Sequence, residues 1–248
     1  MLRRKITTRR VAGSLIIVGA LVMASAIVDG CTSVAGSTPA SLVRVLDASY
    51  NAPALDAYVL AAPIAVNVIG PSVSNYAYAG QGAVTIKLDA TGTTNVIDAL
   101  TGTFAANSQY SIFVADEGKS YTATLLADQS APAPTGDVAF RFLQQAHTTG
   151  NVNVYIIPDG TEISTAKPLF TALAPGAVTK YVDLPAADYD IAIVPTTTVI
   201  GKLGVTPTTV YIGSGTTYAG GQVRTVLILD SQLLNAPPAT VLIANDVN

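Results

Sequence analysis

The chain has 248 residues, of which 50% are hydrophobic and 12% are charged, and its formal net charge is −3. It contains one cysteine, one histidine and no tryptophan. A zinc site needs a cluster of Cys and His ligands, and a serine hydrolase needs a histidine held beside its nucleophile; neither pattern is present. The sequence therefore predicts no metal, no cofactor and no catalytic residue, and a protein that is not an enzyme.

The first thirty residues have the parts of an export signal. Five of the thirteen basic residues lie in the first ten positions, and an uncharged stretch runs from Val11 to Val28 before Asp29 and Gly30. A basic head, an apolar middle and small residues at the exit are typical of a signal peptide. We predict a signal peptide at residues 1–30.

Cys31 follows this segment directly, and Val28-Asp29-Gly30-Cys31 resembles the bacterial lipobox, with Asp29 as an unusual second residue. Because Cys31 is the only cysteine, it cannot form an internal disulfide, and lipidation explains its position. The chain is then anchored to the membrane of the cell envelope through a lipid on Cys31. Thr32, where an inner-membrane retention signal has Asp, favours the outer membrane in a cell with two membranes.

Two other fates of the N-terminal segment remain open. Cleavage near Ala24-Ser25-Ala26, a small-x-small site, releases a secreted protein. Alternatively, the apolar run stays as an uncleaved anchor helix, since it is at the short end of a membrane span.

Removal of the signal changes the charge balance of the chain. Without the five basic residues and Asp29, eight Lys and Arg remain against fifteen Asp and Glu, a net charge of −7. Phosphate contacts need clustered Lys and Arg, and no such cluster is present. We therefore expect no nucleic-acid partner.

Short alternating runs separated by turn residues occupy the rest of the chain. Val84–Leu88, Tyr110–Val114, Val152–Ile156 and Tyr189–Val194 alternate with period two, and Val226–Leu229 is wholly apolar, as in a central strand covered on both faces. Many short strands with turn signals between them are typical of sandwiches. We predict an all-β fold, with two tandem antiparallel β-sandwich domains of immunoglobulin or transthyretin type after the N-terminal signal segment.

The predicted domain order follows from composition. Residues 31–41 are small and polar and suit a flexible tether, while residues 129–137 are Pro-rich and suit a linker. The sandwiches then occupy residues 42–128 and 138–248. The two halves align as degenerate copies: Arg44 falls on Arg141, Tyr76 on Tyr181, and Gln109–Val114 on Gln222–Leu227, with spacings of 97, 105 and 113.

The opening of the first copy, Arg44–Val59, resembles bacterial domain-of-unknown-function family 4397. Members open with Arg-Val-x-His-Ala-Ser-Pro-Asp-Ala-Pro and then Val-Asp-Val-Tyr-Val, and here Asp47 replaces the His and Tyr50 the first Pro. The motif residues are Arg44, Asp56 and Tyr58, and the second copy keeps Arg141 and Tyr155. The resemblance implies an exported, often lipid-anchored and tandem protein, without an established activity.

The motif residues are interpreted as structural. Arg44 is expected to pair with Asp47 or Asp56 at a strand end. Tyr58 is expected to pack at a sandwich edge with its hydroxyl bonded to backbone. His147 is interpreted as an ordinary loop histidine.

These observations favour a non-catalytic envelope or surface lipoprotein that displays two β-sandwiches for binding or scaffolding, with an envelope protein or polysaccharide as partner. One alternative is an enzyme or accessory subunit that acts on envelope polysaccharide. The other is a structural subunit that assembles through edge strands, with Val226–Leu229 as a candidate edge.

The lipoprotein assignment makes a prediction for Cys31→Ser. This change removes the thiol that would be acylated, so we expect an unprocessed precursor and no incorporation of radiolabelled palmitate. Labelling equal to that of the unchanged protein would exclude the assignment.

Overall fold

The computed structural model describes residues 40–200 and 210–247. The predicted signal peptide, Cys31 and most of the predicted tether lie outside these ranges. The described strands are β1 (Ser41–Asp47), β2 (Leu55–Val59), β3 (Ala62–Val68), β4 (Ser72–Val73), β5 (Ala77–Ala79), β6 (Gly82–Ala90), β7 (Val96–Phe104), β8 (Gln109–Glu117), β9 (Ser120–Asp128), β10 (Asp137–Gln145), β11 (Val152–Pro158), β12 (Phe170–Leu173), β13 (Val182–Pro185), β14 (Asp188–Pro195), β15 (Tyr211–Ile212), β16 (Thr216–Thr217), β17 (Val223–Asp230) and β18 (Ala239–Val247). A short 3-10 helix, η1, spans Ile163–Thr165.

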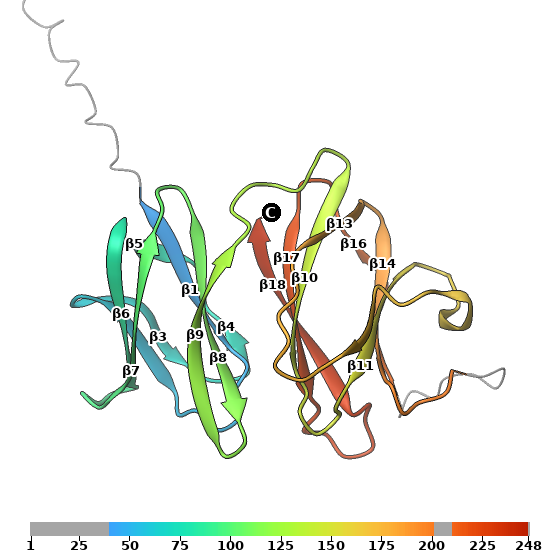
Figure 1. The fold of residues 1–248 in the computed structure, drawn as a ribbon, viewed down its shortest axis with the longest axis horizontal. Helices are drawn as coiled ribbons and strands as arrows, with labels where there is room; N and C mark the ends of the chain where they lie inside the picture. The colour runs from blue at the N-terminus through green and yellow to red at the C-terminus, as the bar shows by residue number, and fades with distance from the viewer. Residues whose placement is uncertain (1–39, 201–209, 248) are drawn as a thin grey trace, which may run out of the picture. The chain divides into compact units, whose positions relative to one another are not determined.

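The first sandwich consists of two sheets (Figure 1). Its inner sheet has the order β4-β1-β8-β9, with β5 also paired to β1, and its outer sheet has the order β3-β2-β6-β7. Apolar side chains from β1 and β8 meet those from β2 and β6, and Val45, Leu55, Ile86 and Ile112 are fully buried between the sheets. The period-two pattern of these strands places one set of side chains in this core.

The second sandwich has the same strand order. Its inner sheet is β13-β10-β17-β18, and its outer sheet is β12-β11-β14-β15, with β16 also paired to β14. Phe140, Phe142, Val154, Ile193 and Val226 are fully buried between these sheets. The predicted all-β sandwich fold is therefore confirmed.

The two inner sheets pack face to face within the compact unit that begins at residue 39. Leu46 of β1, Phe113 of β8, Leu143 of β10 and Leu227 of β17 are buried in one apolar cluster between them. The central strands β1, β8, β10 and β17 are therefore covered on both faces, as the burial of nearly every residue of β10 and β17 shows. The interpretation of Val226–Leu229 as a doubly covered strand is confirmed.

The position of β17 within its sheet contradicts the interpretation of Val226–Leu229 as an assembly edge. β17 lies between β10 and β18, so the backbone groups on both of its edges are already paired. An apolar run alone cannot distinguish a central strand from an edge strand, because both bury side chains.

One pair in each sandwich is parallel, although the sequence predicts antiparallel sheets. β1 runs parallel to β8, and β10 runs parallel to β17, whereas the other described strand pairs are antiparallel. Side-chain alternation reports which face a residue occupies and carries no information on strand direction. The chain reaches each parallel partner by crossing through the outer sheet.

The segment predicted as a linker is bonded to both sandwiches. Ser130 Oγ accepts from the Gln109 amide at 2.7 Å, and the Ala133 amide donates to the Gly221 carbonyl at 3.0 Å. The Ala133 side chain is buried. The connection between the sandwiches is thus packed rather than free.

No helix within residues 40–200 and 210–247 is long and apolar enough to cross a membrane.

Candidate functional site

Arg44 projects from β1 into the contact between the inner sheets and is almost completely buried. Its Nη2 donates to Asp246 Oδ1, and its Nη1 donates to the Asn245 carbonyl at 2.9 Å, both in β18 of the second sandwich. Its Nε donates to Ser111 Oγ at 2.9 Å within its own sandwich. A single guanidinium thus connects β1, β8 and β18.

Arg141 makes the same set of contacts in the opposite direction. From β10 its Nη2 donates to Asp128 Oδ1 at 2.6 Å, and its Nη1 donates to the Ala127 carbonyl at 3.1 Å, both in β9 of the first sandwich. Its Nε donates to Thr225 Oγ1 at 3.2 Å. The two arginines therefore form reciprocal ion pairs across one interface.

Each aspartate is also held by its own sandwich. Asp128 Oδ2 accepts from Ser111 Oγ and from the Tyr76 hydroxyl, the latter at 2.7 Å. Asp246 Oδ2 accepts from Thr225 Oγ1 at 2.6 Å and from the Tyr181 hydroxyl at 2.8 Å.

The two tyrosines also cover the arginines. The Tyr76 ring centroid lies 4.5 Å from Arg44 Cζ, and the Tyr181 ring centroid lies 4.7 Å from Arg141 Cζ. Burial raises the pKa of both hydroxyls, so each remains protonated and donates to its aspartate. Cation–π contact and hydrogen bonding thus act on the same groups.

This set of eight residues, the reciprocal network, is electrically balanced. Its members are Arg44, Tyr76, Ser111, Asp128, Arg141, Tyr181, Thr225 and Asp246. Buried charges are tolerated when they are paired and their remaining hydrogen-bonding capacity is filled, and here both conditions are met. The network therefore fixes the alignment of the two inner sheets.

Two expectations from the sequence about this network are wrong. Arg44 pairs with Asp246 of the other sandwich, not with Asp47 or Asp56. The alignment of β8 with β17 is displaced by one residue, because Ser111 occupies the position of Thr225 beside the equivalent arginine. The correct spacing is 114, and a slip of one residue exchanges the two faces of a strand.

Asp128 and Asp246 are members of the network that sequence reasoning missed. Each lies at or next to the end of the last strand of its sandwich, paired to the strand that carries Ser111 or Thr225. In the sequence, each half carries an aspartate at the equivalent position of its last strand. It could be recognised only with the correct register of the preceding strand.

The family-motif turn after β1 is closed by a carboxylate from β8. Asp116 accepts from Ser49 Oγ and from the amides of Tyr50 and Asn51, the amide contacts being 3.0 and 3.2 Å. In the second sandwich Asp230 likewise accepts from the amides of Thr148 and Thr149, at 2.8 and 2.9 Å. The Tyr50 hydroxyl then donates to the Asp230 carbonyl at 2.8 Å, which connects the two turns.

Asp47 lies beneath the first of these turns and is fully buried. Its Oδ1 accepts from the Ser49 amide at 2.9 Å, whereas its Oδ2 has no hydrogen-bond partner among the described residues. Burial raises the pKa of this carboxyl from 3.8 to about 6, the Ser49 amide opposes the shift, and Asp116 adds to it. The equivalent Gln144 is neutral, and its amide nitrogen donates to the Gly150 carbonyl at 2.8 Å.

Asp56 and Tyr58 lie on β2 in the outer sheet. Asp56 accepts from the Asn67 amide at 2.7 Å and from Thr91 Oγ1 at 2.9 Å, and these bonds lower its pKa. The Tyr58 hydroxyl contacts the Asp56 carboxylate at 3.5 Å rather than backbone, and Lys87 Nζ lies 5.2 Å from its ring centroid. Asp56 therefore connects β2 to β3 and to the turn between β6 and β7.

Tyr155 and His147 occupy different surroundings. Tyr155 is buried in a small cluster on the outside of β11 and β14, together with Ile157, Ala192 and Val194. His147 is exposed, and its Nε2 lies 3.2 Å from Gln145 Oε1. Within the described ranges, no group of three His, Cys, Asp or Glu residues is placed to hold a metal ion.

A family model matches the first part of the chain. Residues 41–155 match the model of the family described as Domain of unknown function (DUF4397). The match covers the opening motif Arg44–Val59 on which the resemblance to this family was based. The matched range contains the first sandwich together with β10, and so includes Arg44, Asp128 and Arg141.

Comparison with characterised proteins adds little. No curated protein matches the chain. Among solved structures, a family 41 carbohydrate-binding module from streptococcal virulence factors, which recognises alpha-glucan, is 12% identical; the match covers 70% of this chain and 88% of that one, with a TM-score of 0.24. A family 26 module from Eubacterium rectale, in complex with maltoheptaose, is 10% identical, with coverage of 82% and 96% and a TM-score of 0.23. At such low TM-scores neither likeness bears on what this chain binds.

The reciprocal network makes a prediction for Asp246→Asn. The change removes the carboxylate that accepts directly from Arg44 and leaves only Asp128 Oδ2, 3.8 Å from Arg44 Nη2, as a neighbouring charge. The free energy of unfolding should therefore fall by about 3 kcal/mol. Urea denaturation measures the change, with the exposed Asp183→Asn as the matched control. A double-mutant cycle with Arg44→Met should give a combined loss smaller than the sum, whereas additive losses would contradict the pairing.

The buried Asp47 makes a prediction about pH. Because its folded-state pKa is raised, the folded protein binds this proton more tightly than the unfolded chain between pH 3.8 and about 6. Its contribution to stability therefore declines as pH rises through that window, by on the order of 2–3 kcal/mol. We expect Asp47→Asn to remove this decline and to be more stable than the unchanged protein above pH 7. The exposed Asp188→Asn is the control, and equal pH dependence in all three proteins would contradict the prediction.

Proposed function

We propose that the chain is an exported envelope lipoprotein, anchored through Cys31, whose two sandwiches act as one rigid, non-catalytic module for binding or scaffolding. The observation that carries this proposal is the reciprocal network between the inner sheets. A ligand-binding surface must hold its groups in fixed positions, and buried ion pairs with fixed partners provide that constraint.

The use of the family-motif side chains supports a display role. Arg44 and Arg141 are occupied by aspartates inside the protein, and Asp56 is surrounded by amide and hydroxyl donors. These groups maintain the fold and the sandwich contact. The loops that they support are then the parts that vary without loss of the scaffold.

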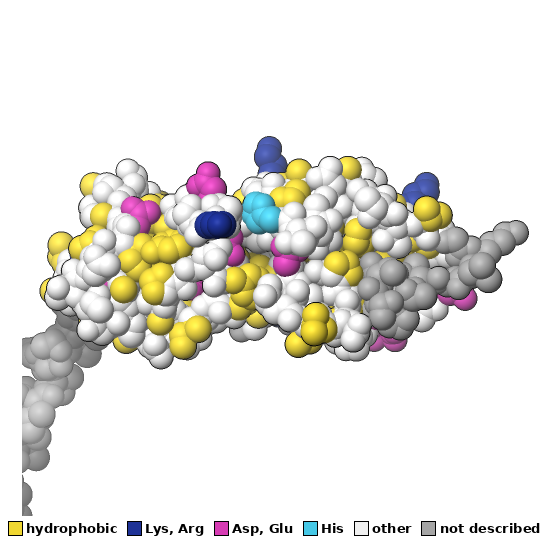
Figure 2. Space-filling view, turned by 90° about the horizontal axis from the view of Figure 1, so that it is seen from below, with side chains coloured by type: hydrophobic (Ala, Val, Ile, Leu, Met, Phe, Trp, Pro, Cys, Tyr) yellow, Lys and Arg dark blue, Asp and Glu magenta, His cyan; other side chains and the backbone are white. Residues whose placement is uncertain are grey.

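The direction of β1 separates Ser41 from the loops that follow the central strands. β1 begins at Ser41, next to the predicted tether, and the turn that follows it contacts Asp230 at the end of β17. Seven residues of strand separate these two ends by about 20 Å. The loops after β1, β8, β10 and β17 therefore gather at the end remote from residue 41 (Figures 1 and 2). Figure 2 shows hydrophobic side chains on this end among mainly uncharged surface.

Sedimentation with envelope fractions tests the proposal. The detergent-extracted protein is incubated with envelopes from which proteins have been digested and, separately, with envelopes from which polysaccharide has been removed. We expect the protein to remain with one of the two fractions and to leave soluble sugar release at the level of the buffer control. Absence from both pellets would exclude a binding role.

Release of soluble sugar above the buffer control would support the alternative of an enzyme that acts on envelope polysaccharide.

Asp246→Asn tests whether binding depends on the rigid contact between the sandwiches. It should bind more weakly than the unchanged protein if the fixed sandwich contact organises the binding surface.

A further inference from the structure

One end of the first sandwich lies where β1 begins, at the point from which the chain leads back to Cys31. The connection from β5 to β6 is held there by the Ser41 hydroxyl, which donates to the Gly80 carbonyl at 2.7 Å. The connection from β7 to β8 is held by the Asn107 amide, which donates to the Ala40 carbonyl at 3.0 Å. Both connections thus flank the start of β1 (Figure 1). We call this surface the near end, and it consists of residues 40–42, 78–83 and 104–109.

The charges of the first sandwich are segregated away from the near end. The three segments that form it contain no Asp, Glu, Lys or Arg. Among the charged residues of the first sandwich, Arg44 and Asp128 are enclosed in the reciprocal network. The others lie toward the opposite end of the strands: Asp47, Asp56, Lys87, Asp89, Asp98, Asp116, Glu117 and Lys119. The near end is therefore a neutral surface on an acidic sandwich.

The side chains of the near end suit the headgroup level of a membrane. Tyr78 is 81% exposed, and Gln81, Ala105, Ala106 and Asn107 are also exposed. Tyrosine is enriched at membrane–water interfaces because its ring is apolar and its hydroxyl is polar. The side-chain amides of Gln81 and Asn107 can donate to phosphate and ester oxygens. The near end adds no carboxylate that anionic headgroups would repel.

The matching end of the second sandwich has different chemistry. Asp188 begins β14 there, and the Asp159 amide donates to the Asp188 carbonyl at 2.9 Å. Both aspartates are exposed. A membrane that contains anionic lipid repels such groups. The near end of the first sandwich, rather than its counterpart, is therefore the surface suited to lipid.

The predicted tether limits which surface reaches the lipid. Ser41 lies ten residues after Cys31. A chain of this length spans about 35 Å when fully extended and about 17 Å as a random coil. The opposite end of the sandwich lies about 20 Å farther along β1. A short tether also gives an effective concentration on the order of 1 mM, so a weak contact with lipid is sufficient.

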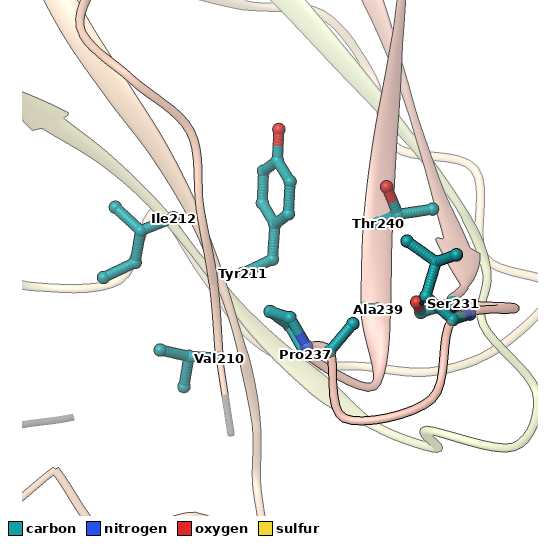
Figure 3. A pocket seen from close by; sticks show the side chains of 9 residues that line it. Val210, Tyr211, Ile212, Ser231, Pro237, Ala239 and Thr240 are labelled. Atoms are coloured by element: carbon teal, nitrogen blue, oxygen red, sulfur yellow. Dashed lines mark hydrogen bonds between the residues drawn. The ribbon is translucent and has the colours of Figure 1, made fainter. Parts of the chain in front are cut away.

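The remote end of the second sandwich exposes large aliphatic side chains, which provide a control for position. Leu233 and Leu234, in the loop between β17 and β18, are 75% and 94% exposed. Leu233 lines a cavity of about 560 Å³ that also has Tyr211 and Thr240 in its walls (Figure 3). This loop is apolar but lies at the end of the strands away from the tether. It therefore distinguishes the effect of location from that of hydrophobicity.

We propose that the near end rests on the headgroups of the membrane that holds the lipid on Cys31, with Tyr78 at headgroup level. This inference rests on the proposed lipid anchor and gives the anchored module an orientation. The loops after β1, β8, β10 and β17 then face away from the membrane.

Fluorescence quenching by lipid tests the proposal. The lipidated protein with Gln81→Cys is labelled with a thiol-reactive nitrobenzoxadiazole probe, and Leu234→Cys is labelled as the control. Each is reconstituted into vesicles of phosphatidylethanolamine and phosphatidylglycerol, with and without a nitroxide on the headgroups. The lipid occupies the Cys31 thiol, so the probe reacts with the introduced cysteine. We expect quenching of the Gln81→Cys label to exceed that of the Leu234→Cys label at least about threefold.

Two charge variants test the near end itself. Tyr78→Glu places a carboxylate on it and should reduce quenching of the Gln81→Cys label to about the level of the Leu234→Cys label, because phosphatidylglycerol repels the added charge. Thr94→Glu adds the same charge at an exposed position of the turn between β6 and β7, at the opposite end, and should leave the quenching unchanged. Cooperative urea unfolding of each variant establishes that it is folded.

The outcomes separate this contact from the anchor. Equal quenching of the Gln81→Cys and Leu234→Cys labels would overturn the proposal, as would full quenching in Tyr78→Glu. A blue-shifted Gln81→Cys label that nitroxide lipid does not quench would also overturn it and assign the near end to protein. Flotation with the vesicles reports the anchor in parallel. Protein that floats without selective quenching retains the anchor and loses the orientation, whereas protein that does not float contradicts both.

Discussion

Two ion pairs that cross in opposite directions between the sandwiches determine how the rest of the chain is arranged. Each arginine lies on a central strand of one sandwich and finds its carboxylate on the edge strand of the other. Removing four charges from water is costly unless every one is paired in good geometry, so the pairs are satisfied in one alignment of the inner sheets. The apolar cluster around Leu46 and Leu227 buries further surface between the inner sheets and excludes water from their contact.

The arrangement explains where the two sandwiches agree and where they differ. Strands that contribute to the shared contact carry equivalent residues, as in Ser111 and Thr225 or Tyr76 and Tyr181. Positions away from the contact have changed freely. The outer face of the second sandwich is covered around Tyr155, whereas Tyr58 of the first is half exposed beside Lys87. The network positions thus agree between the sandwiches, whereas positions outside the network differ, as Asp47 and Gln144 of the inner sheets also do.

The sequence predicted the class of fold because class depends on side-chain alternation and turn residues. Alternation in Val84–Leu88 and the apolar run Val226–Leu229 correctly indicated half-covered and doubly covered strands. The directions of β8 and β17 could not be predicted, since side-chain patterns do not report strand direction. The parallel pairs depend on how the chain crosses between sheets, which is a property of the whole sandwich.

The site was harder to predict than the fold, for a physical reason. Arg44 and Arg141 were recognised as motif residues, but their partners lie 202 and 13 residues away, on strands of the opposite sandwich. A local search for an ion pair therefore proposed Asp47 and Asp56, which are close only in sequence. The one-residue slip in aligning β8 with β17 concealed Ser111 and Thr225 as equivalents, and with them the aspartates that they hold.

The reciprocity of the contact has a consequence for the number of sandwiches that one chain can hold. A contact related by a two-fold operation uses the same patch on both partners and closes on itself. Once Arg44 has bound Asp246 and Arg141 has bound Asp128, neither inner sheet has a guanidinium or a carboxylate of this set left for a third sandwich. A longer chain built on the same contact would grow by whole pairs, so its modules would be counted in even numbers.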